Sequence, residues 1–328
     1  MIEPKQHLTP DLLSTEVMQE ATRMGFGRGL LEAGHKNKNI VALCADLTES
    51  TRISEFAKSY PDRFVEMGIA EQNLVTVAAG MALAGKIPFV ASYAAFSPGR
   101  NWEQIRTTIC LNETNVKIVG AHAGVSVGPD GATHQMLEDI ALMRVLPNMT
   151  VVVPADAVEA EKATQVLAEY VGPAYIRLAR EKSPIISTEK TPFSLSKAQV
   201  LRTGKDLTIV ACGTMVYQAL MAAEKLDLQG ITAEVINAAV VKPLDTITIV
   251  ASARKTGAVL TVEEAQIAGG LGGAVAETLS DHMPVPMTRI GMLDRFGESG
   301  TPAELLEYFG LTAPNIIAKA LDLVRRKA

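Results

Sequence analysis

An alternation of short apolar runs with longer helical patterns is the feature of this sequence that most restricts its fold. The apolar runs have the length of buried strands, and the helical patterns lie between them. In the first half, strands are expected at residues 39–45, 87–91, 116–121, 150–153 and 174–178, and helices at 14–32 (capped by Ser14 and stopped by Gly34), 71–84, 98–111, 135–145 and 157–170. This alternation predicts a mainly parallel sheet with helices on both faces.

The periodicity is lost after residue 181, in a segment that contains Pro184 and Pro192. We interpret residues 185–206 as a linker that includes a short extended segment. A second α/β pattern follows, with strands expected at 207–212, 231–237, 258–262 and 286–290 and helices at 215–227, 246–255, 271–281, 302–308 and 313–325. The sequence therefore predicts two α/β domains, residues 1–184 and 207–328.

The charge balance argues against a nucleic-acid-binding protein, because a net charge of −5 gives no diffuse attraction to a polyanion. No apolar run is long enough to span a bilayer, and the N-terminus lacks the layout of a signal peptide. Cys44, Cys110 and Cys212 are far apart and lie in or beside apolar segments. They are typical of reduced core thiols, so we expect a cytoplasmic protein without a membrane segment.

Glu71 stands at the start of an expected helix that is almost wholly apolar. Nine of the eleven side chains from 74 to 84 are apolar, which indicates a buried helix. An exposed carboxylate here would simply favour the positive end of the helix dipole. A buried one needs a partner or a chemical task, and it can share or donate a proton.

Two aromatic residues and a polar cluster follow Glu71 along the chain. Tyr93 and Phe96 are three residues apart, and such rings can stack on flat heterocycles, although taken alone they are more typical of core packing. Asp130 and His134 lie in a later Gly-rich segment. One acid, an aromatic wall and a polar cluster indicate half of a site for a heterocyclic cofactor, because nothing here would hold the phosphates of such a cofactor.

Several of these side chains directly follow expected strands. Asp46, Tyr93, His122 and Arg180 each stand at or just beyond the end of one. In parallel sheets, ligands bind beyond the carboxyl ends of the strands. We therefore expect these four residues to converge.

Several separate motifs, in order, carry a resemblance to a known family. GIAEQN, SYAAF, AHAGVSVGPDGATHQ and PNMTVVVPAD resemble the pyrimidine-binding half of thiamine-diphosphate enzymes of the transketolase family. The later YIRLAREKSP, VEEAQIAGGLGGAVAE and DRFGESGTPAELLEYFGL resemble the end of that domain and the C-terminal domain of the family. The resemblance covers essentially the whole chain.

The resemblance implies which residues face the cofactor. Glu71 would bond the ring nitrogen of the aminopyrimidine of thiamine and so promote its imino form, which removes a proton from the thiazolium ring. Phe96 would stack on the pyrimidine, with Tyr93 in the same wall. Asp46 and Leu47 would lie near the cofactor and the subunit interface.

The resemblance also implies a sugar channel. The imidazoles of His122 and His134 would bind hydroxyl groups or the reacting oxygen, which makes them catalytic candidates beside Glu71. Asp130 would orient the C2 hydroxyl of an aldose acceptor. The terminal phosphate of the substrate would be held by Arg23, Ser50 and Arg180, since a guanidinium presents a planar pair of donors to a phosphate.

The chain departs from the full-length family in two ways. It has no Gly-Asp-Gly motif, so a separate N-terminal subunit would bring the diphosphate-binding domain together with Mg²⁺ or Ca²⁺. This implies a split transketolase that assembles as an α2β2 heterotetramer. Gly99, with Arg100 beside it, stands where transketolases often have an aromatic residue and deoxyxylulose phosphate synthases have an arginine.

Other functions stay open on the sequence alone. The β subunit of a 2-oxo acid dehydrogenase has a similar fold and an equivalent Glu, but the DGATHQ run, Arg23 and Ser50 argue against it. Half of a 1-deoxyxylulose-5-phosphate synthase would reveal itself by pyruvate dependence. A non-catalytic assembly subunit is an alternative of another class. The presence of Glu71, Phe96, Asp130 and His134 counts against it.

Overall fold

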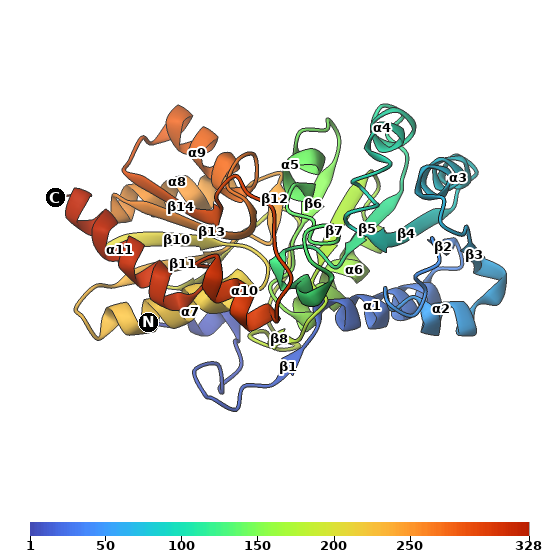
Figure 1. The fold of residues 1–328 in the computed structure, drawn as a ribbon. Coiled ribbons are helices and arrows are strands. Elements are labelled where there is room, and N and C mark those ends of the chain that lie inside the picture. The colour runs from blue at the N-terminus through green and yellow to red at the C-terminus, as the bar shows by residue number, and fades with distance from the viewer. Residues whose placement is uncertain (328) are drawn as a thin grey trace.

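A seven-stranded sheet forms the centre of the first half of the molecule (Figure 1). The structure is a computed structural model that describes residues 1–327. The strand order is β12-β6-β7-β5-β4-β2-β3, and all neighbours are parallel except β12 and β6. The strands are β2 (Ile40–Cys44), β3 (Phe64–Glu66), β4 (Ile87–Tyr93), β5 (Lys117–Ala121), β6 (Thr150–Val152), β7 (Ala174–Leu178) and β12 (Val240–Lys242).

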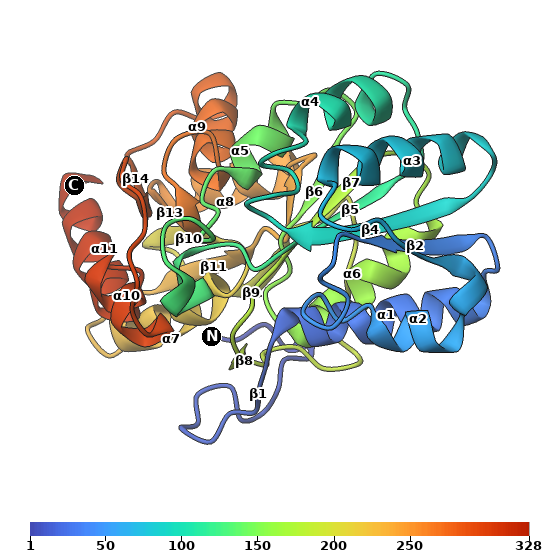
Figure 2. The same cartoon turned by 45° about the vertical axis from the view of Figure 1, so that its right-hand side comes forward.

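Helices cover both faces of this sheet, as Figure 2 shows from the side. One face carries α1 (Thr22–Lys36), α2 (Ser54–Ser59) and α6 (Ala157–Glu169). The other carries α3 (Glu71–Leu83), α4 (Trp102–Gln104), the π-helix η3 (Ile105–Cys110) and α5 (Asp139–Arg144). Short 3₁₀ turns are η1 (Pro4–Gln6), η2 (Pro61–Arg63) and η4 (Val125–Asp130).

The second half folds around a five-stranded sheet of order β14-β13-β10-β11-β9, in which only β9 is antiparallel to its neighbour. A third, two-stranded pair consists of β1 and β8. The remaining elements are β1 (Gln19–Glu20), β8 (Ser183–Pro184), β9 (Gln199–Arg202), β10 (Leu207–Ala211), α7 (Met215–Asp227), β11 (Ala233–Asn237), α8 (Thr246–Thr256), β13 (Val259–Gln266), α9 (Leu271–His282), β14 (Met287–Met292), α10 (Pro302–Tyr308) and α11 (Ala313–Lys327). Two mainly parallel sheets flanked by helices confirm the predicted fold class.

The two halves share one continuous core. Strand β12 belongs to the second half of the chain, yet it completes the edge of the first sheet. Leu74 of α3 and Ile140 of α5 belong to the same buried cluster as Ile249 of α8 and Leu271 of α9. Burial of apolar surface therefore fixes the second half against the first.

The predicted first helix is wrong at both ends. It was expected to begin at Ser14, but α1 begins at Thr22, because residues 19–20 instead form β1 and pair with β8. The predicted stop at Gly34 lies inside the helix, which continues to Lys36. A Cβ at Gly34 would lie 2.5 Å from the Phe56 ring, so this glycine permits close helix packing and does not end the helix.

Other elements differ in extent or were missed. The helix expected at 98–111 begins only at Trp102 and continues as the π-helix η3, and the helix expected at 135–145 is reduced to α5. The sequence reading contained neither α2 nor the three-residue strands β3 and β12. Elements this short carry too few residues for a periodicity to be recognised.

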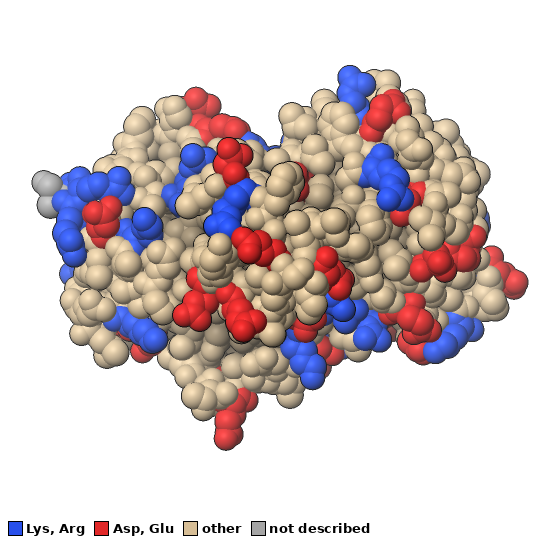
Figure 3. Space-filling model, viewed as in Figure 1, with Lys and Arg blue, Asp and Glu red and all other residues tan. Residues whose placement is uncertain are grey.

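The surface carries both signs of charge. Figure 3 shows Lys and Arg interspersed with Asp and Glu over this face, without an extended patch of one sign. Within residues 1–327, no helix combines the length and apolar character needed to cross a membrane. Cys44, Cys110 and Cys212 are buried free thiols.

Candidate functional site

An aromatic cluster lies at the ends of β4 and β5. Tyr93 is the last residue of β4, and its ring centroid lies 4.3 Å from that of His122, which follows β5. The Tyr93 and Phe96 rings are stacked with centroids 6.1 Å apart. His134 closes the cluster edge-on, 5.5 Å from Phe96. Two parallel strands that end at one edge of the sheet thus bring together side chains from distant segments.

Arg23 and Ser50 line the cluster on the side of His122. The Nη1 atom of Arg23 donates to the Ser50 carbonyl at 2.9 Å and lies 3.0 Å from Nε2 of His122. Because arginine can only donate, Nε2 must accept and the ring proton resides on Nδ1. Tyr93 completes this side, since its hydroxyl donates to Oγ of Ser50 at 3.1 Å.

The electrostatics of this side keep the His122 ring neutral. Its side chain is buried, and desolvation together with Arg23 and Arg180 lowers the pKa of His122 from 6.5 to about 3. Desolvation, followed by the charges of Arg52 and Arg180, also lowers the pKa of Arg23. Asp130 belongs to this group through Arg180, whose Nη1 donates to Oδ2 of Asp130 at 2.8 Å.

Glu71 is buried at the first turn of α3, with a side chain only 1% exposed, and has the partner that such burial requires. Nη1 of Arg100 donates to Oε2 of Glu71 at 2.8 Å. The Arg100 guanidinium also lies over the Phe96 ring, 4.8 Å from its centroid. Asn101 fixes the start of the helix by donating to the Glu71 carbonyl at 2.8 Å. The Arg100 guanidinium therefore contacts both the Glu71 carboxylate and the face of the Phe96 ring.

Gly99 explains why Arg100 can take this position. A Cβ at Gly99 would lie 2.1 Å from the carbonyl oxygen of Ala95, so this backbone admits no side chain there. Arg100, the next residue, supplies the group that covers Phe96. The residue that covers the Phe96 ring is therefore Arg100, and position 99 has no side chain.

Asp46 and Leu47 lie on the loop after β2 but outside the cluster. Within residues 1–327, the exposed Asp46 carboxylate makes no hydrogen bond, whereas its backbone N–H donates to Oε1 of Glu66 at 2.7 Å. The Leu47 carbonyl accepts from Thr51, which closes the loop. The structure therefore places these two predicted residues beside the site without a contact to Glu71.

Sequence reasoning missed four residues around the site. Arg100 and Asn101 contact Glu71, Glu66 ties together the loops at 46–48 and 68, and Arg52 adds a third guanidinium near Arg23. Arg100 stands beside Gly99, four residues after the SYAAF run, and this charge close to the two aromatic residues was a usable signal for it. Glu66 and Arg52 had none, because their contacts join segments that no spacing rule connects.

The side chains around Glu71 fit one end of the implied cofactor, its flat ring. A buried carboxylate with an aromatic face beside it can hold a flat ring that carries N–H donors. Among residues 1–327 no group of three metal-ligating side chains is found.

Comparison with known proteins identifies the family of both halves of the chain. Residues 18–185 match the model of the transketolase pyrimidine-binding domain, and residues 196–316 match that of the transketolase C-terminal domain. A putative transketolase C-terminal section from Methanocaldococcus jannaschii is 44% identical over 308 residues, which cover 93% of this chain and 96% of that protein. A 6-deoxy-6-sulfo-D-fructose transketolase subunit from Clostridium sp. is 44% identical over 91% of this chain and 92% of that subunit.

A solved structure described as a split-gene transketolase in an inactive β4 tetramer is similar in three dimensions. It is 49% identical, with a TM-score of 0.88 over 94% of this chain and 99% of that one. Both halves of the chain and almost the full length of these relatives are thus matched. The chain belongs to the transketolase family as the C-terminal subunit of a split transketolase, a transferase.

Proposed function

We propose that this chain supplies the aminopyrimidine half of a thiamine-diphosphate site and the sugar channel of a two-chain enzyme. The complex transfers a two-carbon ketol unit from a ketose phosphate to an aldose phosphate, with pentose phosphates as the first substrates to try. The observation that carries this proposal is the convergence of Glu71, Phe96, His122 and His134 at one edge of the first sheet. Residues 1–184 and 207–328 act as its two domains.

The contacts of Arg100 support the fit of an aminopyrimidine. Its guanidinium is a planar cation that bonds Glu71 and covers Phe96. A protonated aminopyrimidine has the same flat face and N–H donors. Thiamine diphosphate, when bound, supplies the carbanion chemistry of the reaction. Glu71 would hold a proton at the ring nitrogen, Phe96 and Tyr93 would wall the ring, and Arg100 would leave Glu71.

Arg23, Ser50 and Arg180 fit the terminal anion of the substrate. Arg23 and Arg180 are close enough that each lowers the pKa of His122, and Arg23 already donates to Ser50. In the substrate-free chain Arg180 is held by Asp130, an ion pair that is about one-third exposed. A phosphate would replace this carboxylate with an anion that accepts from two guanidiniums at once.

The hydroxyl groups of the sugar would meet His122, His134 and Asp130. The neutral His122 offers an Nδ1–H donor and, once Arg23 turns to the anion, an Nε2 acceptor. Nδ1 of His134 lies 2.8 Å from Oγ1 of Thr133, which orients the ring toward Phe96. These two imidazoles can exchange protons with hydroxyl groups as acid–base partners.

The missing half of the site would come from an N-terminal transketolase subunit that binds the diphosphate and Mg²⁺ or Ca²⁺. We propose an α2β2 heterotetramer, in which the outer face of α3 is a candidate contact. Gly80 has open space around it, and Leu83 is exposed at the end of that helix. The related split-gene chain was solved as an inactive β4 tetramer, which favours a need for the partner. Three buried free thiols favour the cytoplasm.

A reconstitution assay tests this division of labour. Ketol transfer from xylulose 5-phosphate to ribose 5-phosphate is measured with thiamine diphosphate and Mg²⁺, for this chain alone and for its complex with a Gly-Asp-Gly subunit. Activity only in the complex supports the proposal, and activity of this chain alone contradicts it. A complex that acts on pyruvate instead identifies a deoxyxylulose phosphate synthase type of reaction.

Glu71→Gln tests the assigned role of the carboxylate. We expect kcat to fall about 100-fold or more in the complex, since an acid–base group contributes that order of rate. Equilibrium dialysis with thiamine diphosphate gives a readout independent of turnover and should show weaker binding. Glu55→Gln, at an exposed carboxylate on α2, is the matched control. A fully active Glu71→Gln complex would rule out the catalytic assignment.

A further inference from the structure

Residues of the second domain contact the Gly-rich loop that carries Asp130. We propose that Glu264 and Gln135 are positioning residues that hold this loop in place for sugar binding. The loop comprises residues 124–131 and includes the 3₁₀ turn η4. This inference rests on the proposed function, because the sugar channel is what the loop would serve. It assigns the second domain a task in the reaction beyond packing.

Glu264 reaches the loop from β13 of the second domain. Its Oε1 atom accepts from the backbone N–H of Ser126 at 2.7 Å, and its Oε2 atom accepts from the Thr214 hydroxyl at 3.3 Å. Glu264 is 4% exposed, and burial raises the pKa of its carboxyl group. The loop fits closely around it, since a Cβ at Gly124 would lie 2.3 Å from Oε1.

Gln135 secures the loop from the inside. Its Nε2 atom donates to the carbonyls of Val125 at 3.1 Å and Gly128 at 3.0 Å. The same atom donates to the carbonyl of Glu298, in the second domain, at 2.8 Å. Gln135 is 3% exposed, and a Cβ at Gly297 would lie 1.8 Å from its Oε1 atom. The two N–H groups of one amide are thus shared among three carbonyls, which join the start and the middle of the 3₁₀ turn to the other domain.

The segment 297–302 covers the rest of the loop. A Cβ at Gly131 would lie 2.5 Å from Oγ of Ser299, and one at Gly128 would lie 3.3 Å from Cδ of Pro302. Both glycines have positive φ values, of 72° and 85°. The loop therefore adopts a backbone that few other residues accept, against a surface that leaves no room for side chains.

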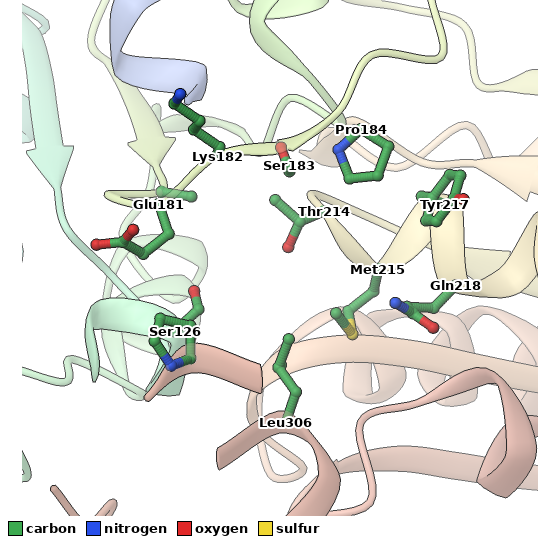
Figure 4. A pocket seen from close by; sticks show the side chains of 12 residues that line it. Ser126, Glu181, Lys182, Ser183, Pro184, Thr214, Met215, Tyr217, Gln218 and Leu306 are labelled. Atoms are coloured by element: carbon green, nitrogen blue, oxygen red, sulfur yellow. The ribbon is translucent and has the colours of Figure 1, made fainter. Parts of the chain in front are cut away.

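Apolar packing is incomplete on the other side of the loop, where polar contacts take its place. A pocket of about 100 Å³ lies beside Ser126. Figure 4 shows its lining, which includes residues 181–184 of the first domain and Thr214, Met215 and Leu306 of the second. On this side of Ser126 the hydrogen bond from its backbone to Glu264 supplies the contact that packed side chains do not. The neighbouring Val125 is buried in the core of the second domain and holds the loop from the opposite direction.

The position of the loop determines where groups of the proposed sugar channel lie. Asp130 lies at its end and pairs with Arg180, and Arg180 also donates to the Val127 carbonyl at 3.1 Å. The backbone N–H of His134 donates to the Gly131 carbonyl at 3.0 Å. A loop that drifts from Glu264 would move the groups proposed to bind the anion and the hydroxyl groups of the sugar.

Glu263 provides a matched control one residue away. It is fully buried on the same strand, and its carboxylate also accepts from backbone N–H groups, those of Leu271 and Gly272, both at 2.7 Å. These belong to the start of α9, within the second domain. Glu263→Ala and Glu264→Ala therefore delete equivalent buried acceptors, and only the second faces the loop.

Hydrogen exchange of the assembled complex tests the structural part of the inference. In Glu264→Ala we expect the amides of residues 124–131 to exchange at least about tenfold faster, the loss that corresponds to one hydrogen bond. Glu263→Ala should speed exchange at the start of α9 and leave the loop unchanged. Equal loop protection in the two variants overturns the proposal, whether or not the complex has ketol-transfer activity.

Kinetics test the functional part. Glu264→Ala should raise the KM of the ribose 5-phosphate acceptor about tenfold, more than Glu263→Ala does at similar loss of stability. Glu264→Gln should restore most of this, because an amide oxygen can accept from Ser126 while the amide N–H₂ group faces the Thr214 hydroxyl. An acceptor KM that rises equally in the Glu263 and Glu264 variants would reduce Glu264 to a purely structural residue.

A second variant approaches the same contact from the loop. Gly124→Ala would place a methyl group against Glu264, at a backbone φ of 91° that itself disfavours alanine, and would alter no residue of the second domain. We expect the same increase in loop exchange and acceptor KM as in Glu264→Ala, so the test remains available if that variant fails to fold. A Gly124→Ala complex with unchanged loop exchange would contradict the proposal. If the wild-type complex lacks ketol transfer, the proposed function fails, and the exchange data still test the loop.

Discussion

Acid should destabilise this chain through His122, by an amount that follows from the surroundings of its ring. Burial, Arg23 and Arg180 lower the pKa of His122 from 6.5 to about 3. Between these pH values the unfolded chain binds a proton that the folded chain excludes. The contribution of the neutral ring to stability is therefore present above pH 6.5 and is lost as the pH falls toward about 3.

The pH dependence of the free energy of unfolding corresponds to the binding of one proton by the unfolded chain. One pH unit corresponds to about 1.4 kcal/mol, so the free energy of unfolding should fall by about 2 kcal/mol between pH 6.5 and pH 5. Three buried carboxyl groups act in the opposite direction, because desolvation raises the pKa of Glu159 and of Glu263 to about 7 and also raises the pKa of Glu264. Their contribution grows as the pH falls from about 7 toward 4.5, so a single pH scan mixes the two signs.

A comparison with His122→Gln isolates the imidazole. Glutamine keeps an acceptor for Arg23 and does not titrate, and the contributions of the carboxyl groups cancel in the difference. Urea unfolding at pH 6.5 and pH 5, at one protein concentration, should show the wild type losing about 2 kcal/mol more than the variant. His35→Gln, at an exposed position of α1, controls for the loss of a histidine. Equal pH dependence in wild type and His122→Gln would refute the reasoning that the ring is held neutral.

Two further substitutions test ion pairs in very different surroundings. Arg100→Gln should tighten thiamine diphosphate binding to the complex by at least about fivefold in equilibrium dialysis, because the cofactor no longer displaces the half-exposed Arg100 guanidinium from the buried Glu71 carboxylate, and even an exposed ion pair is worth up to about 1 kcal/mol. Weaker binding would show that Arg100 holds the cofactor. Asp139→Asn should cost about 3–5 kcal/mol of unfolding free energy in a urea titration, because it leaves the buried Arg177 guanidinium without its carboxylate. Lys58→Ala, at an exposed pair, is its control, and similar losses in both would contradict the argument.

The convergence of Tyr93, His122 and Arg180 could be predicted because it depends on sheet geometry alone. They follow β4, β5 and β7, which are neighbours in the sheet and run in the same direction. Residues just beyond the ends of neighbouring parallel strands share an edge, so a correct strand assignment was enough to bring them together. Glu71 and Phe96 needed more, namely the motif resemblance.

The contacts of Glu264 and Arg52 could not be predicted from the sequence. Glu264 lies 138 residues from Ser126, and its neighbour Glu263 has the same residue type, burial and strand but faces another way. Alternation along a strand says that the two point to opposite faces without saying what each face meets. The contacts of each face depend on how the two sheets pack together, and that packing is determined by the whole core.

The charges of the site argue for an anionic substrate independently of any resemblance. Arg23, Arg52 and Arg180 are close enough that the other two lower the pKa of Arg23, and within residues 1–327 the Nε atoms of Arg23 and Arg52 are buried without a hydrogen-bond partner. Asp130 and Glu181 both lie within ion-pair distance of Arg180. Buried donors without acceptors are costly, and a terminal phosphate or sulfonate would supply three oxygens to them. A hydroxyl oxygen of a neutral sugar can accept a hydrogen bond but brings no charge to three neighbouring guanidiniums, so their cluster supports the proposal of a substrate that carries a terminal anion.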